Sequence, residues 1–284
     1  MTKVKVIELF AGIGSPRKAL EKLNIKHEVV AFSEIDKHAI ESYRAIHDDY
    51  VTPNLGDIKE ISYLPPCDLL TYGFPCQDIS VAGKGEGIKE GTRSGLLYEV
   101  ERLLEIGVIL GTLPKYLILE NVKALTQKKH RQQFDEWLEK LESLGYTNYY
   151  QVLNAKDYGI PQNRERVFVI SILGDHKPFV FPEKQELNLR LRDLLEDEVE
   201  ERYYLKDEKT QEFIEKYKDK IINLQEGIYP CLTPERLNKR QNGRRFKNEN
   251  EDMFTLTAQD RRGVIKIGSL TDSNSQGERV YTTD

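Results

Sequence analysis

The chain has 284 residues, which is enough for about two domains, and its net charge is −5. Its hydrophobic fraction of 39% is low for a globular chain, so part of it should be polar or should leave apolar surface for something else to cover. The sequence contains neither an apolar run of the ~18 residues that a membrane helix needs nor a signal peptide, and its three cysteines lack zinc-site or disulfide spacing. These features predict a cytoplasmic protein without a membrane segment or a metal site.

The first part of the chain alternates short apolar strands with amphipathic segments. The expected strands cover residues 4–10, 27–32, 68–72, 116–119 and 167–173, and the expected helices cover 37–47, 96–110 and 131–144. Another helix should open near Pro16, because proline lacks the N–H that is unsatisfied at this position anyway. This alternation predicts an α/β fold in which helices cover both faces of a mostly parallel sheet. In such sheets ligands bind at the carboxyl ends of the strands.

The character of the chain changes after residue 178. Residues 186–226 hold 13 acidic and 8 basic residues, which favours a solvated helical connector. Residues 235–247 reverse the sign, with six basic residues and one acidic residue. We therefore expect three parts: a ligand-binding α/β domain over 1–178, an acidic helical connector over 179–227, and a smaller domain over 228–284.

Glycines and acids follow the first strands. Gly12 and Gly14 would let a nucleotide-like ligand approach the backbone, but Arg17 replaces the third glycine of the dinucleotide fingerprint. Glu34 follows the second strand, where a carboxylate can hold ribose hydroxyls. Asp57 follows a third strand-like segment and could accept a hydrogen bond from an adenine amino group. Singly each acid is as well explained by solvation, but together they indicate an adenosyl ligand.

Cys76 lies just past a strand end, in the sequence Gly-Phe-Pro-Cys-Gln. A lone cysteine is more often a small buried hydrophobic residue than a nucleophile. The glycine-rich stretch that follows it, residues 77–94, is however suited to act as a mobile lid.

Two further motifs carry charge at strand boundaries. Glu120 leaves a buried strand, where desolvation can keep a proton on a carboxyl group at neutral pH; its neighbour Asn121 could instead cap a helix. Gln162, Arg164 and Arg166 are spaced by two and would share one face of a strand. A surface charge ladder is the alternative to an anion-binding or carbonyl-binding role.

In this order and spacing, the segments ELFAGIG, GFPCQ, ENV and QNRER resemble the cytosine-5 DNA methyltransferases of bacteria and phages. The resemblance covers about residues 4–172. It implies a Rossmann-like sheet that binds S-adenosylmethionine (SAM), yields S-adenosylhomocysteine, and transfers the methyl group to carbon 5 of a cytosine flipped out of double-stranded DNA. It also makes residues 228–284 a partial target-recognition domain.

The resemblance implies roles for individual residues. The covalent nucleophile would be Cys76, Glu120 would donate to ring nitrogen 3, and Arg166 would hold the base carbonyl with support from Arg164. The cofactor pocket would be lined by Phe10, Gly12, Gly14, Glu34, Asp57, Pro75 and Leu96. Contacts to DNA would come from Gln77, Arg93, Asn121, Gln162, Lys239, Arg240, Arg244 and Arg245.

The sequence departs from the family pattern after the QNRER segment. The short motif by which family members return to the cofactor pocket is absent, so we expect a chain that ends inside its recognition region. A complementing polypeptide or self-association could then replace the return segment. Three functions therefore stay open: a DNA methyltransferase of a restriction–modification or phage self-protection system, with a cognate endonuclease as a partner; a tRNA cytosine-5 methyltransferase; and an inactive or incomplete subunit of a split enzyme.

Overall fold

The computed structural model describes residues 3–75, 94–196, 199–221, 227–234, 244–247, 251–254, 262–267 and 280–283. The chain forms two compact units. Unit 1 comprises Met1–Leu153 and Glu165–Pro182, and unit 2 comprises Asn154–Arg164 and Glu183–Asp284.

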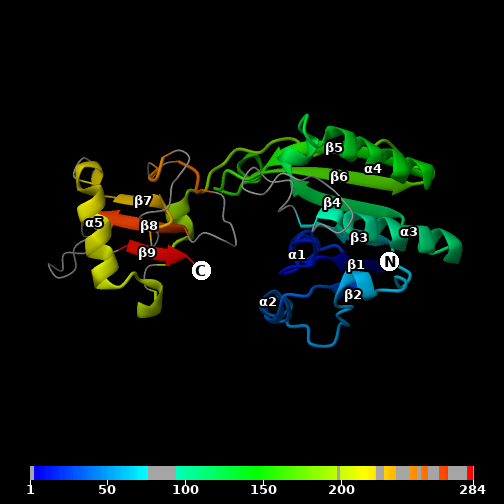
Figure 1. Cartoon of the computed structure of the whole chain (residues 1–284), viewed down its shortest axis with the longest axis horizontal. Helices are drawn as coiled ribbons and strands as arrows, with labels where there is room; N and C mark the ends of the chain where they lie inside the picture. The colour runs from blue at the N-terminus through cyan, green and yellow to red at the C-terminus, as the bar shows by residue number, and fades with distance from the viewer. Residues whose placement is uncertain are drawn as a thin grey trace. The chain divides into compact units, whose positions relative to one another are not determined.

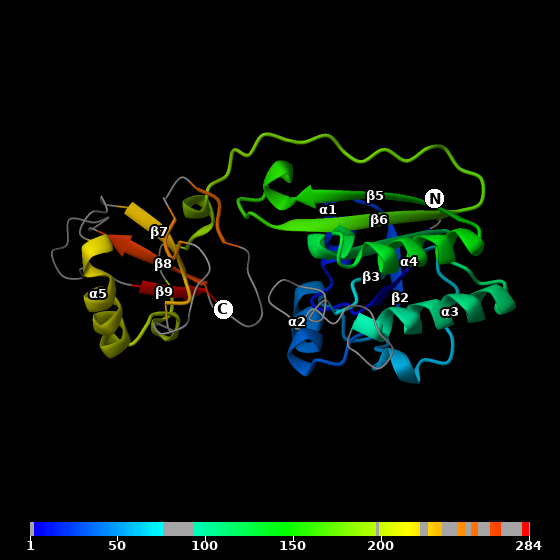
Figure 2. The ribbon, with the colours of Figure 1, turned by 45° about the horizontal axis from the view of Figure 1, so that its top comes forward.

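Unit 1 is built on a six-stranded sheet with the order β2-β1-β3-β4-β6-β5 (Figures 1 and 2). Its strands are β1 (Val4–Leu9), β2 (His27–Ser33), β3 (Leu69–Tyr72), β4 (Tyr116–Val122), β5 (Tyr146–Asn154) and β6 (Glu165–Leu173). The pairs β1–β2, β1–β3 and β3–β4 are parallel, whereas β6 runs antiparallel to β4. The mostly parallel α/β sheet that we predicted is therefore present.

Helices cover both faces of this sheet, as predicted. They are α1 (Ser15–Lys22), α2 (Lys37–His47), α3 (Leu97–Leu110) and α4 (Arg131–Ser143), with short 3₁₀ turns η1 (Ile58–Glu60), η2 (Ser94–Leu96) and η3 (Lys123–Thr126). Side chains of a strand alternate between the two faces. Ile7 packs with residues of α3 and α4 in the main core, whereas Val6 packs against Leu20 of α1. Glu8, on the same face as Val6, meets Tyr43 of α2.

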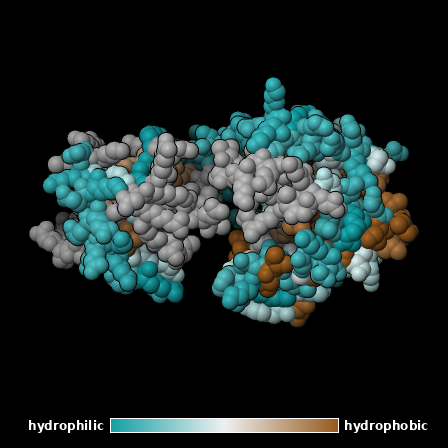
Figure 3. Space-filling view, in the orientation of Figure 1, coloured by the Kyte–Doolittle hydropathy of each residue, from teal (hydrophilic) through white to brown (hydrophobic). Residues whose placement is uncertain are grey.

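The apolar character of the sequence is concentrated in the core of unit 1. The largest cluster joins Leu70, Leu117 and Val167 of the sheet to Leu103 of α3 and Phe134 of α4. Figure 3 shows a mostly hydrophilic surface, with apolar side chains exposed where α3 ends at Val108, Ile109 and Leu110. No helix among the described residues is long and apolar enough to cross a bilayer.

Unit 2 contains an antiparallel sheet of β7 (Gly227–Leu232), β8 (Arg262–Ile267) and β9 (Val280–Thr283), together with α5 (Asp207–Ile221). It also holds the turns η4 (Ala155–Tyr158), η5 (Leu191–Leu194) and η6 (Glu201–Tyr203). Phe213 of α5 is fully buried against Cys231 of β7 and Ile265 of β8. The helix expected in the connector is therefore present, and it packs on the small sheet. The three-part division at residues 178 and 227 stays a prediction.

Two details of the sheet of unit 1 differ from the expected elements. We did not predict β5, an edge strand in which every residue after the buried Tyr146 is exposed or half-buried, without a clear alternation. Strand β6 begins at Glu165, so Gln162 and Arg164 lie before it rather than on it. The prediction that Gln162, Arg164 and Arg166 share one strand face is therefore wrong.

Candidate functional site

The turn after β1 is held in left-handed backbone conformations. Phe10, Gly12 and Gly14 have φ angles of 55°, 54° and 76°, in the region that glycine adopts at little cost. The Ala11 N–H donates to the Ser33 carbonyl at 3.0 Å, which ties the turn to the end of β2. A Cβ atom on Gly12 would meet no atom within 4 Å, so the backbone there borders open space. The turn thus forms a cradle that a ligand can approach closely.

Glu34 follows β2, and its carboxylate faces this turn. Oε2 accepts the N–H of Gly12 at 2.8 Å, while Oε1 accepts the N–H groups of Ile35 at 2.8 Å and Asp36 at 2.9 Å. A carboxylate offers about four acceptor positions. The backbone therefore orients Glu34 and leaves it capacity for the hydroxyl groups of a ligand.

Asn54 fastens the loop that carries Glu34, although we did not single it out in the sequence. Its Nδ2 donates to the Glu34 carbonyl at 2.9 Å, and its Oδ1 accepts the N–H groups of Glu34 at 3.1 Å and Gly56 at 3.0 Å. Asp57 follows at once and caps η1 by accepting the Lys59 N–H at 3.0 Å. The available signal was the Asn-Leu-Gly sequence, since asparagine side chains bond nearby backbone groups in turns.

The register of the parallel strands aligns the carboxyl ends of β1, β2 and β3 with Leu119 of β4. Leu9 pairs with both Ser33 and Tyr72, and Tyr72 pairs with Leu119. Directly after these paired residues come Phe10, Glu34 and Gly73, which follow β1, β2 and β3, and Glu120, which is still on β4. Phe10 and Glu34 of the predicted cofactor residues, and the predicted acid Glu120, therefore lie at the carboxyl ends of β1, β2 and β4. Pro75 and Leu96 are both half-buried, and Leu96 packs against the main core.

Glu120 and Arg166 form an ion pair across β4 and β6. Arg166 Nε lies 3.1 Å from Glu120 Oε1, with 19% and 39% of the respective side chains exposed. A Cβ atom on Gly73 would lie 3.3 Å from the Glu120 carbonyl oxygen and 3.7 Å from Oε2, so glycine leaves room for the pair. The desolvation expected at Glu120 is therefore partial. The pair presents a carboxylate and a guanidinium side by side, which suits a planar ring with mixed donors and acceptors.

Asn121 follows Glu120 on β4 and is buried. Its Nδ2 donates to the Phe74 carbonyl at 3.1 Å, and its Oδ1 accepts the Val122 N–H at 2.8 Å. The side chain is thus used to hold the Gly-Phe-Pro corner that leads to Cys76. This position corrects the expectation that Asn121 contacts DNA, because only 3% of the residue is exposed.

Comparison with known proteins agrees with this arrangement. The family model described as "C-5 cytosine-specific DNA methylase" matches residues 4–283. The chain belongs to this family. It is 42% identical over 264 residues to the type II methyltransferase M2.ScrFI of Lactococcus lactis subsp. cremoris. This alignment covers 74% of this chain and 72% of that protein. It is also 32% identical over 376 positions to the orphan methyltransferase M.SPBetaI of Bacillus phage SPbeta, covering 93% of this chain and 84% of the relative.

Solved structures of methyltransferases share the fold. The Entamoeba histolytica methyltransferase EhMeth has a TM-score of 0.61 at 21% identity, over 76% of this chain and 66% of that chain. The Dnmt2 methyltransferase of S. pombe has a TM-score of 0.57 at 22% identity, over 76% of this chain and 67% of that chain. At these identities the likeness shows the fold alone, a Rossmann-like sheet covered by helices. The chain is thus a cytosine-5 DNA methyltransferase of this fold, with DNA as the substrate of its family.

The residues of unit 1 fit the SAM that this family uses. Glu34 offers oriented carboxylate oxygens for ribose hydroxyls, and the Gly12 backbone borders open space at the carboxyl end of β1. Asp57 uses Oδ1 in its cap, so its second carboxylate oxygen can accept a hydrogen bond from a ligand. No group of three or more potential metal ligands occurs among the residues that the structure describes.

Several predicted site residues lie outside the described residues. These are Cys76, Gln77, Arg93, Lys239 and Arg240. Their assigned roles stay predictions that rest on the sequence resemblance.

Gln162 and Arg164 belong to unit 2, and their backbone groups contact other residues of this unit. The Arg164 N–H donates to Asn154 Oδ1 at 3.0 Å, and its carbonyl accepts the Ala155 N–H at 3.0 Å. Gln162 forms an isolated bridge with Met253. These contacts shape the segment that leads into β6, on which Arg166 lies.

The two described arginines of the basic segment differ sharply. Arg244 is an exposed side chain that pairs with Glu251. Arg245 is only 7% exposed, and its Nη1 donates to the carbonyls of Leu232 and Thr233, both at 3.0 Å. Its guanidinium also lies 5.1 Å from the centre of the Tyr217 ring. This position corrects the expected phosphate contact of Arg245, which is buried and whose Nη1 donates inside unit 2.

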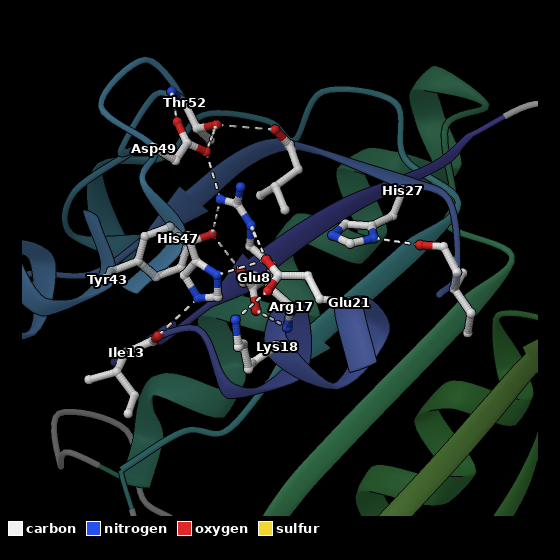
Figure 4. A network of polar contacts seen from close by, with 12 residues as sticks. Glu8, Ile13, Arg17, Lys18, Glu21, His27, Tyr43, His47, Asp49 and Thr52 are labelled. Atoms are coloured by element: carbon white, nitrogen blue, oxygen red, sulfur yellow. Dashed lines mark hydrogen bonds and ion pairs between the residues drawn. The ribbon is translucent and has the colours of Figure 1, made fainter. Parts of the chain in front are cut away.

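A buried polar network lies beside residues 10–14, the turn after β1, which is called the cofactor turn below because of its predicted role (Figure 4). Glu8 accepts the Tyr43 hydroxyl at 2.7 Å and the Arg17 N–H at 3.1 Å. Arg17 Nη1 donates to Asp49 Oδ2 at 2.6 Å. Burial raises the pKa of Glu8, whereas bonds from Thr52 and Arg17 outweigh burial and hold the pKa of Asp49 well below its ordinary value. The network fixes α1 and α2 against β1, and none of its members was predicted.

Proposed function

We propose that the Glu120–Arg166 pair is the cytosine-binding part of the active site. The observation that supports this is the 3.1 Å ion pair at the same sheet edge as the cofactor turn. In this proposal cytosine separates the ion pair: Arg166 donates to the base carbonyl oxygen, and Glu120 takes up a proton from solvent and donates it to ring nitrogen 3. Both groups stabilise the charge that develops when the ring is attacked.

The reaction in this proposal begins at Cys76. Its thiolate forms a bond to carbon 6 of the flipped cytosine, and the electron pair of the carbon 5–carbon 6 bond makes carbon 5 nucleophilic. Glu120 supplies a hydrogen bond or proton at nitrogen 3, which limits the negative charge on the ring. When bound, SAM supplies a methyl group on a positively charged sulfur and leaves as S-adenosylhomocysteine. Loss of the carbon 5 proton then expels the Cys76 thiolate and restores the double bond.

The direct test is methyl transfer from labelled SAM by this chain alone, to unmethylated double-stranded DNA and to bulk tRNA in parallel. Label in DNA is the expected result. Label confined to tRNA would favour the tRNA alternative, and no label despite SAM binding would favour an incomplete subunit that needs a complementing polypeptide. The DNA target, action in the cytoplasm and a cognate endonuclease stay predictions, and sequencing the methylated DNA would give the target.

Replacing Cys76 by Ser should abolish methyl transfer and leave SAM affinity within about twofold. The serine hydroxyl stays protonated at neutral pH and does not form the covalent bond to carbon 6 at a useful rate. Rates come from the labelled-SAM assay, and affinity comes from calorimetry. A parallel loss of both quantities would contradict the assignment of Cys76 as the nucleophile, whereas Cys67→Ser is a matched control in unit 1 that should lower neither by a large factor.

We propose that Arg244 contacts DNA phosphate, and that Arg245 has a structural task. Arg244→Gln should reduce the slope of log affinity against log salt by about one, the value of one phosphate contact. Arg202, also exposed and paired with a glutamate in unit 2, is the matched control, and Arg202→Gln should leave the slope unchanged. Arg245→Gln should instead lower the free energy of unfolding by roughly 1.5–3 kcal/mol, because buried charge-assisted hydrogen bonds are lost. An unchanged slope for Arg244→Gln would place the phosphate contacts elsewhere.

A further inference from the structure

His47, the last residue of α2, lies against the cofactor turn and contacts Ile13 (Figure 4). Its side chain is 0% exposed. Nδ1 lies 3.0 Å from Glu21 Oε1, and Nε2 lies 3.2 Å from the Ile13 carbonyl oxygen. The ring also touches the Gly14 position so closely that a Cβ atom there would lie 2.4 Å from Nε2. The imidazole therefore joins α1, α2 and the turn.

Both partners of this imidazole are acceptors. A peptide carbonyl has no proton to donate, and an ionised carboxylate has none either. Hydrogen bonds from Lys18 and from His47 lower the pKa of Glu21, and together they outweigh burial, which raises it. This carboxyl group is therefore ionised near neutral pH. A neutral imidazole carries a single N–H and can satisfy one of the two contacts only. The geometry therefore matches the imidazolium form, which has an N–H on each nitrogen.

We propose that His47 is a positioning residue for SAM binding, and that its charged form holds the cofactor turn in place. The inference rests on the proposed role of the turn in SAM binding. Ile13 stands between Gly12 and Gly14, and Gly12 N–H orients the carboxylate of Glu34. Fixing the Ile13 carbonyl thus fixes the peptide groups that lead to the ribose-binding carboxylate.

Deprotonation of His47 breaks its hydrogen bond to the turn and leaves the one to α1. A hydrogen bond to a carboxylate is stronger than one to a carbonyl, so the neutral ring keeps its proton on Nδ1 and turns a lone pair toward the Ile13 carbonyl. Other charged groups face this site from α1 (Arg17, Lys18 and Glu21), from β1 (Glu8), and from α2 and the loop after it (Tyr43 and Asp49). Glu21 also keeps Lys18 as a partner at 2.8 Å when His47 is neutral, so its carboxylate stays in place.

The expected result is a SAM affinity that depends on the charge of His47. In the wild-type chain, measured from pH 5.5 to pH 8.5, the dissociation constant for SAM should rise about three- to tenfold when His47 loses its charge, which is the effect of losing one hydrogen bond. The His47→Gln variant should bind SAM with the weaker affinity and show no such rise. The matched control is His27→Gln, since His27 contacts the Ile25 carbonyl outside the turn and should keep the wild-type profile.

A second measurement separates the charge of His47 from the proposed function. Nitrogen NMR of the unliganded wild-type chain should show both ring nitrogens of His47 protonated at pH 6. A ring with one proton at pH 6, or the same pH profile of SAM affinity in the wild type and His47→Gln, overturns the proposal. If the variant does not fold, the wild-type titration decides, because SAM affinity must then fall as the NMR signals report deprotonation. A doubly protonated ring in a wild-type chain that binds no SAM contradicts the proposed cofactor role instead.

Discussion

Replacing Glu120 by Gln is expected to lower the rate of methyl transfer by about 10²–10⁴-fold, the usual contribution of a positioned acid–base group. Glutamine has nearly the same shape, but its neutral amide forms no ion pair with Arg166, which lies 3.1 Å from Glu120, and it cannot take up a proton and pass it to the bound base. The cofactor residues lie on other loops, so the affinity for SAM should stay within about twofold. The loss should therefore appear in the chemical step.

Single-turnover methyl transfer to unmethylated DNA measures this step without product release. Glu165 is the matched control, because it neighbours Arg166 on β6 and forms a 2.8 Å ion pair with Lys123. Both partners of that pair are about half exposed, so Glu165→Gln should change stability and rate only slightly. A Glu120→Gln rate within threefold of the wild type would remove Glu120 from the chemistry.

The edge of the sheet was predictable because its signals are local. Phe10, Glu34 and Glu120 each lie at, or within two residues of, the end of an apolar run, and the ends of such runs can be located from the sequence and from the glycines that follow. In a parallel sheet such ends meet at one edge. The register of β1 to β4 then aligns them within a residue. The grouping of these residues therefore followed from the fold class alone.

The residues that were misplaced or missed depend on contacts between distant segments. Arg245 looked like its exposed neighbour Arg244, and its burial depends on Thr233 and on Tyr217 of α5. Asn54 can bond the backbone of Glu34 only because the end of β2 and the loop after it lie beside it. The Gln162–Arg166 spacing suggested one strand, but Gln162 bridges to Met253 and the strand starts later. Local spacing contains no information on such partners.

Replacing Gly14 by Ala should destabilise unit 1 strongly, whereas the same change at Gly12 should mainly weaken SAM binding. Both glycines have positive φ angles, which cost an alanine about 1–2 kcal/mol. At Gly14 the new Cβ atom would also lie 2.4 Å from His47 Nε2 and 2.6 Å from Tyr43 Cε2. Forcing an extra carbon into such a packed site adds about 1–3 kcal/mol. We therefore expect a total loss of about 2–5 kcal/mol for Gly14→Ala.

At Gly12 the added carbon meets nothing within 4 Å of the protein, so only the backbone strain enters the free energy of unfolding. The same carbon would occupy the space that the cofactor needs, and the affinity for SAM should fall by at least tenfold. Gly111, at the end of α3, has a φ of 66° and equally open surroundings, so Gly111→Ala controls for strain alone. Urea unfolding and SAM calorimetry on the three variants separate the two effects. Equal unfolding free energies for Gly12→Ala and Gly14→Ala would contradict the packing of His47 and Tyr43 against the turn, and unchanged SAM affinity in Gly12→Ala would contradict its place in the pocket.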